Sequence, residues 1–131
     1  MINKNLKIAV CGSISFMDEM EKLEGSLKEL GFKEVFRPIG VGGHEKEFKE
    51  NMTLQEDGKR KIELDLINMH WHKILKSDCV LIANYEKKKV KGYIGGNTFL
   101  EMGFAFVTGK PIFLLNPIPE MSYTPEIEGM Q

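Results

Sequence analysis

Cysteine and histidine are scarce in this sequence, which limits the metal and disulfide chemistry that it predicts. The chain of 131 residues has two cysteines, Cys11 and Cys79, and three histidines. Neither cysteine has another metal ligand close to it in the sequence, which argues against a structural zinc site. Each cysteine adjoins an apolar run typical of a β-strand. We therefore expect both thiols to be buried and reduced, as in a cytoplasmic protein.

The sequence also lacks an excess of charge of one sign and any long apolar run. It has 18 Lys and Arg residues and 19 Asp and Glu residues, which gives a net charge of −1 at pH 7. This balance argues against a protein dedicated to nucleic acids or membrane surfaces. No apolar run approaches the roughly 20 residues that span a bilayer, and the first residues lack the apolar stretch of a signal peptide.

The length and composition are those of one globular domain, residues 1–131, with 42% hydrophobic and 28% charged residues. Short apolar runs alternate with segments of helical periodicity, which predicts an α/β fold with a parallel sheet and right-handed crossovers. A loop and a short helix are expected within 39–58. The expected strands are 6–11, 34–38, 79–83 and 112–115, and the expected helices are 15–30, 59–77 and 97–108, with a final helical turn near the end of the chain.

The loops that follow the strands are the expected location of a ligand site. The continuous apolar run 79–83 is typical of a central strand that is covered on both faces. Ligands of open parallel sheets bind beyond the carboxyl ends of the strands. We therefore expect loops 12–16 and 84–97 and the segment from 116 onward to meet at one edge.

Glu101 lies in the segment GYIGGNTFLEMGFAF, residues 92–106, and two roles are open for it. Thr98 and Glu101 have the spacing of a capping box, in which the Glu side chain reaches back to the helix start. Alternatively, Glu101 is an ionised carboxylate, favoured by the positive end of the helix, that attacks an electrophilic carbon.

Two short loops offer backbone amides to a ligand. Gly95 and Gly96 allow a close approach to the backbone, and the free amides of a helix start suit an anion. The loop from Gly12 to Ser15 is either a tight turn in which Ser15 caps the next helix, or a site where Ser13 holds a sugar or phosphate oxygen. Neither a Walker loop nor the dinucleotide fingerprint is present.

Two further groups of polar residues are candidates for a role at a site. Residues 87–91, KKKVK, form either a solvated loop or a flexible lid that attracts an anionic substrate. His70 and His72 are two residues apart on an expected helix, so they point in different directions and do not form a paired metal site.

Three segments of the chain resemble the nucleoside 2-deoxyribosyltransferase-like superfamily, which includes the 2′-deoxynucleoside 5′-phosphate N-hydrolases. They are AVCGSISF (9–16), ILKSDCVLIANY (74–85) and GGNTFLEMGFAFVTGKPIFLL (95–115), in the order of that family and over most of the chain. The third segment is the most specific, because Glu-Met-Gly-Phe-Ala follows a glycine turn.

The resemblance implies a flavodoxin-like, doubly wound parallel sheet of four to five strands and cleavage of an N-glycosidic bond. Glu101 falls at the position of the catalytic nucleophile, which forms a glycosyl-enzyme ester. Hydrolysis follows with water, and transfer follows with a second base. The resemblance further implies no metal or organic cofactor and a homo-oligomer, a dimer or larger. The implied substrate-binding residues are Gly12, Ser13, Ile14, Phe16, Asn84, Gly95, Gly96 and Asn97.

The sequence departs from the family pattern at two positions. His70 stands where the family commonly has an aspartate, and it is a candidate proton donor to the leaving base. Gly95 stands where the transferase branch has an aspartate and the hydrolase branch a serine. Residues 87–91 favour a phosphorylated substrate, and the lack of a long C-terminal extension slightly disfavours transfer.

The leading hypothesis is therefore N-glycosidic cleavage or transfer on a nucleoside or nucleoside 5′-monophosphate, with Glu101 and His70 as catalytic residues. The alternative is a non-catalytic nucleotide-binding or sensing module on the same fold. A third reading, from the likeness of GGNTFLE to the loop of lysine-decarboxylase-like phosphoribohydrolases, predicts cleavage of a ribonucleotide.

Overall fold

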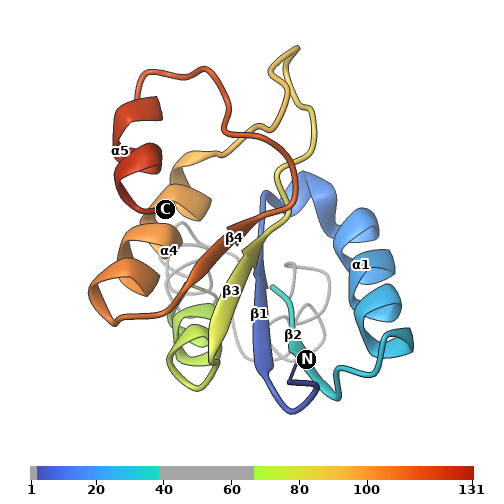
Figure 1. Cartoon of the computed structure of the whole chain (residues 1–131). Helices are drawn as coiled ribbons and strands as arrows, with labels where there is room; N and C mark the ends of the chain where they lie inside the picture. The colour runs from blue at the N-terminus through green and yellow to red at the C-terminus, as the bar shows by residue number, and fades with distance from the viewer. Residues whose placement is uncertain (1–2, 39–66) are drawn as a thin grey trace, which may run out of the picture.

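The computed structural model of the chain describes residues 3–38 and 67–131 (Figure 1). The loop and short helix expected within 39–58 lie outside the described residues, as does the first part of the helix expected over 59–77. Of that helix, residues 67–75 are described and are helical.

Four strands form one parallel sheet in the order β2-β1-β3-β4. The predicted α/β fold with a flavodoxin-like parallel sheet is thereby confirmed. Each observed strand lies inside its predicted range and is shorter by one or two residues. The strands are β1 (Lys7–Cys11), β2 (Glu34–Phe36), β3 (Cys79–Ile82) and β4 (Ile112–Leu114).

Helices cover both faces of the sheet. In Figure 1, α1 (Met17–Glu29) lies on one side of the strands, whereas α4 (Gly96–Val107) and α5 (Thr124–Gly129) lie on the other. The helix of residues 67–75 shares the α4 face, since Ile74 belongs to the core cluster of that face. The fold is doubly wound, as predicted.

The position of β3 between two covered faces explains why its sequence is apolar without interruption. Val80 and Ile82 pack in the core under α4 and α5, whereas Cys79 and Ala83 pack in the core under α1. Successive side chains of a strand point to opposite faces, so a strand covered on both faces needs apolar residues at every position.

The start of the first helix differs from the sequence prediction. A short 3₁₀ helix, η1 (Ile14–Phe16), precedes α1, and the Ser13 hydroxyl accepts the Ser15 backbone N–H at 3.3 Å. Ser13 rather than Ser15 therefore caps this end, because the chain turns into a helical conformation two residues earlier than the sequence pattern indicates.

No helix in residues 3–38 and 67–131 combines the length and the apolar character needed to cross a membrane.

Asn84 joins the ends of β3 and β4 on the carboxyl side of the sheet. Its buried amide donates to the Asn116 carbonyl at 2.9 Å and accepts the Asn116 backbone N–H at 2.8 Å. The Asn116 side chain donates in return to the Asn84 carbonyl at 2.9 Å. Gly92 packs against this pair with φ of +70°, and a Cβ there would lie 2.6 Å from the Pro117 carbonyl oxygen. These contacts fix the loop that leads to α4.

Asn84→Ala is expected to lower the free energy of unfolding by about 1–3 kcal/mol, because the Asn116 N–H and carbonyl lose their buried partner. Urea denaturation followed by circular dichroism measures the change. Asn68→Ala, at an exposed helical position, is the matched control and should change stability by less than about 0.5 kcal/mol. Equal losses in the two variants would contradict the structural role of Asn84.

Candidate active site

A pocket of about 270 Å³ opens at the carboxyl edge of the sheet. The volume is close to the lower limit of about 300–1,000 Å³ for small-molecule sites. Five segments form its described walls: the loop after β1, the residue Pro38 after β2, the helix of residues 67–75, the residue Tyr93 in the loop after β3, and the start of α4. The lining residues are Gly12, Ser13, Ile14, Pro38, Ile67, Met69, His70, Lys73, Tyr93, Gly95, Gly96, Asn97, Thr98 and Glu101.

Glu101 does not form the capping box that the sequence allows. The α4 helix begins at Gly96 with Gly95 as its N-cap residue, and no side chain in the described part of the chain caps it. Thr98 is therefore the third helical residue, and Glu101 lies in the second turn rather than the first. The expected support from the positive helix end is also weaker than predicted, since that effect falls off within the first turn.

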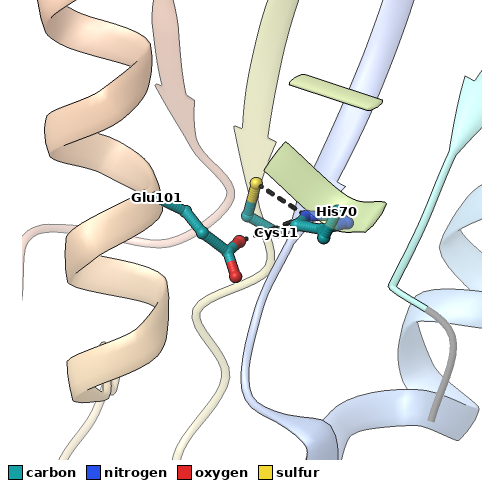
Figure 2. Close-up of side chains that lie close together, drawn as sticks. All are labelled: Cys11, His70 and Glu101. Atoms are coloured by element: carbon teal, nitrogen blue, oxygen red, sulfur yellow. Dashed lines mark hydrogen bonds and ion pairs between the residues drawn. The ribbon is translucent and has the colours of Figure 1, made fainter. Parts of the chain in front are cut away.

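The Glu101 side chain points instead toward His70 and Cys11 (Figure 2). His70 Nε2 lies 3.1 Å from Glu101 Oε2 and 3.4 Å from Cys11 Sγ. The side-chain exposure of His70 is 5% and that of Glu101 is 13%, and Cys11 is fully buried. The three side chains come from β1, the helix of residues 67–75 and α4, and they meet where the sheet ends.

The three side chains are close without forming a complete hydrogen-bond network. Although His70 Nε2 approaches Glu101 Oε2, that contact is not aligned as a hydrogen bond, and Oε2 is buried without a hydrogen-bond partner among the described residues. His70 Nδ1 likewise has none among them. Burial raises the pKa of the Cys11 thiol well above its usual value, and the adjacent Glu101 carboxylate raises it further. Cys11 is therefore a neutral thiol at neutral pH.

A basic side chain reaches the pocket wall from the loop after β3. Lys87 Nζ donates to the Ser13 hydroxyl at 3.1 Å, and it lies 5.3 Å from the centre of the Tyr93 ring. The Ser13 and Ser15 hydroxyls are 2.7 Å apart. Two hydroxyls and one ammonium group therefore converge beside the loop that follows β1.

Of the two alternatives for residues 87–91, the structure has the solvated loop, in the form of a tight hairpin turn at residues 87–90. Lys87 and Val90 exchange both backbone hydrogen bonds, at 3.1 and 2.9 Å. Lys88 and Lys89 between them have φ of 52° and 62°, the left-handed conformation that a type I′ turn requires at both central positions. The turn directs Lys87 toward Ser13 and leaves Lys88 and Lys89 exposed.

The first glycine of the site is required by close packing. A Cβ at Gly12 would lie 3.0 Å from Met20 Sδ and 3.2 Å from the Ala83 carbonyl oxygen. A larger residue at this position would push the loop after β1 away from the end of β3. Gly12 therefore allows the Ser13 loop to lie against the sheet edge.

The pocket brings together most of the residues selected from the sequence, but two lie elsewhere. Phe16 is buried in the core under α1, where its ring contacts that of Tyr85, and the Asn84 amide bonds to the loop after β4. Neither lines the pocket. The selected residues that line it are Gly12, Ser13, Ile14, His70, Gly95, Gly96, Asn97 and Glu101.

Several groups at the site were not selected from the sequence. Cys11 was expected only as a buried strand residue, and Lys73 and Tyr93 were not considered. Lys73 lies one helical turn after His70, so the i, i+3 spacing on one helix face was an available signal for it. Burial lowers the pKa of Lys73, and the nearby Lys76 and Arg37 charges lower it further.

No family model matches this chain, and no curated protein matches its sequence.

This arrangement can support chemistry on a neutral or anionic small molecule. A carboxylate and an imidazole whose side chains are mostly shielded from water line one pocket, and hydroxyl and ammonium donors lie beside it. A carboxylate nucleophile and a proton donor are the components that displacement at a sugar carbon needs, and the hydroxyl and ammonium donors suit an anionic group on the same molecule.

Proposed function

We propose that the chain cleaves the N-glycosidic bond of a nucleoside 5′-monophosphate or nucleoside, with Glu101 as the nucleophile. The observation that carries this proposal is the Glu101 carboxylate at the wall of a pocket of about 270 Å³, with a side-chain exposure of 13%. In Figure 2 one carboxylate oxygen is directed toward His70 and Cys11 and the other is directed away from them. The second oxygen is the one available for attack.

The reaction proceeds in two displacements. A Glu101 oxygen attacks the anomeric carbon, the bond from this carbon to the base nitrogen breaks, and its electron pair leaves with the base. The base takes a proton from His70 or from water. Water then attacks the anomeric carbon of the glycosyl ester, the bond from this carbon to the Glu101 oxygen breaks, and the sugar leaves as the carboxylate is restored. The proton that the water loses returns to His70 or to solvent. If a second base attacks instead, the sugar is transferred.

The groups beside Ser13 favour a 5′-monophosphate over an unphosphorylated nucleoside. A phosphate offers acceptor oxygens to the Ser13 hydroxyl and to the Lys87 ammonium, which lie 3.1 Å apart. The Gly12–Ser13 loop and the start of α4 lie on the same pocket, so a sugar between them would reach both Glu101 and this anion site.

The resemblance to the nucleoside 2-deoxyribosyltransferase-like superfamily supports the same reaction and remains part of the proposal, as does a cytoplasmic location. A homo-oligomer is also proposed. Exposed apolar side chains on α4 and the edge strand β4 support it, among them Leu100, Phe106 and Phe113, which are 63%, 52% and 56% exposed. Apolar surface of this kind marks contact sites between proteins.

A non-catalytic nucleotide-binding module is the second candidate. One observation favours it: Glu101 Oε2 faces buried groups rather than solvent, which is the arrangement of a structural carboxylate. Tight binding of a monophosphate without release of free base, across a panel of ribo- and deoxyribonucleotides, is the expected result under this candidate.

Glu101→Gln is expected to lower the rate of base release by at least about 10³-fold, or about 4 kcal/mol of transition-state stabilisation, because an amide is a poor nucleophile. Chromatographic measurement of free base from deoxynucleoside 5′-monophosphates tests it. Glu126→Gln, at an exposed position of α5, is the control and should retain full activity. Unchanged activity in Glu101→Gln would exclude Glu101 as the nucleophile.

His70→Gln is expected to lower kcat on a natural substrate by about 10²–10⁴-fold, the usual contribution of a general acid. A deoxyribosyl donor with a nitrophenolate leaving group needs no proton, so its kcat should fall much less. His72→Gln, on the same helix but exposed, should behave as the unmodified protein. An equal loss on both substrates would mean that His70 positions Glu101 and does not protonate the base.

Lys87→Met is expected to raise KM for the 5′-monophosphate at least about tenfold, since a charge-assisted hydrogen bond contributes about 1.5–3 kcal/mol. KM for the unphosphorylated nucleoside should stay within about twofold. Lys88→Met changes the charge by the same amount at the next position of the same turn, where the side chain is exposed, and is the matched control. Equal increases in KM for both substrates would contradict a phosphate role for Lys87.

A further inference from the structure

Three zinc-type ligand groups converge at the inner end of the pocket. Cys11 Sγ, a ring nitrogen of His70 and a carboxylate oxygen of Glu101 all lie within 4.8 Å of one another. Neither cysteine has another metal ligand close to it in the sequence. The fold brings this set together across separations of 59 residues between Cys11 and His70 and 31 between His70 and Glu101.

We infer that Cys11, His70 and Glu101 form a binding site for a divalent cation of the zinc class. A thiolate, an imidazole and a carboxylate are all ligands that Zn²⁺ accepts, and a set that includes thiolate and imidazole disfavours Mg²⁺ and Ca²⁺. Three protein ligands with a fourth position open to a pocket are typical of zinc sites that exchange water or bind a ligand.

The distances fit a four-coordinate ion. Zinc bonds of about 2.3 Å to sulfur and about 2.0–2.1 Å to nitrogen and oxygen put neighbouring tetrahedral ligand atoms about 3.3–3.6 Å apart. The observed separations are 3.4 Å from Cys11 Sγ to His70 Nε2 and 3.1 Å from His70 Nε2 to Glu101 Oε2, and Cys11 Sγ lies within 4.8 Å of the Glu101 carboxylate. Two of the three pairs therefore already have close to the spacing of tetrahedral zinc ligands.

The burial of these atoms also favours a cation. Glu101 Oε2 is buried without a hydrogen-bond partner among residues 3–38 and 67–131, and such an atom is costly to leave unsatisfied. A cation would coordinate it directly. Binding converts the Cys11 thiol to a thiolate and releases its proton to solvent, as metal coordination of thiols does.

The site and the proposed reaction use the same carboxylate. An ion held by Glu101 would compete with attack on the anomeric carbon, so zinc should inhibit base release. This consequence rests on the proposed function, whereas binding of the ion does not.

Titration of the full chain with Co²⁺ tests the site without reference to activity. We expect one Co²⁺ per chain, a thiolate-to-cobalt charge-transfer band, and displacement by equimolar Zn²⁺ but not by the same concentration of Mg²⁺. Cys11→Ala should abolish the band, whereas Cys79→Ala, which removes the buried thiol of the neighbouring strand, should retain it. Absence of the band in the unmodified protein, or its persistence in Cys11→Ala, would overturn the inference.

A second pair of variants tests the site without changing a residue of the sheet. The pair is His70→Gln and, as its exposed control, His72→Gln. His70→Gln should weaken Zn²⁺ affinity by at least about tenfold, the lower limit found even for loss of an outer-shell partner, and His72→Gln should not. Equal affinities in the two variants would also overturn the inference. Zinc binding by a chain that releases no base even when it is free of metal would leave this site standing and refute the proposed function. Base release by a chain that does not bind zinc would overturn the cation site and support the proposed function.

Discussion

The parallel register between β1 and β3 determines where the candidate site lies. Cys11 pairs with Ile82 at the carboxyl ends of the two strands, and the Ala83 N–H donates to the Cys11 carbonyl at 2.7 Å. The two strands therefore end at the same level of the sheet. This puts the Gly12–Ser13 loop beside the segment that leads to α4. The site depends on this register, because a shift of one residue would turn the Cys11 side chain to the opposite face.

The Glu101 carboxylate at this edge of the sheet is suited to two roles, that of a nucleophile and that of a metal ligand. Glu101 extends from the second turn of α4 toward His70 and Cys11, and its side chain also lines the pocket. Shielding from water strengthens its electrostatic interactions, whether the partner is a developing positive charge on a sugar carbon or a metal ion. The proposed cleavage and the inferred cation site are thus competing consequences of the same placement.

The sequence predicted the order of elements, the sheet edge and most of the pocket residues, since each depends on local patterns such as the apolar run 79–83. It failed at the start of α4, where the observed N-cap residue, Gly95, lies three residues before the cap that the capping box predicted, Thr98. Because α4 begins at Gly96, Thr98 is not the cap and Glu101 is not in the first turn. Contacts between segments that are far apart in the sequence could not be predicted either. Cys11 with His70 and Ser13 with Lys87 are 59 and 74 residues apart, and their meeting depends on strand register and on the turn at residues 88 and 89.

Trapping with a 2-fluoro-2-deoxyribosyl donor followed by peptide mass spectrometry shows whether Glu101 becomes glycosylated. The fluorine slows both displacements, so the glycosyl ester should accumulate. A nucleophilic Glu101 gives a single added 2-fluorosugar mass on the peptide that contains it. If an intact chain releases base from this donor but carries no added mass, or carries it on another residue, Glu101 is not the nucleophile.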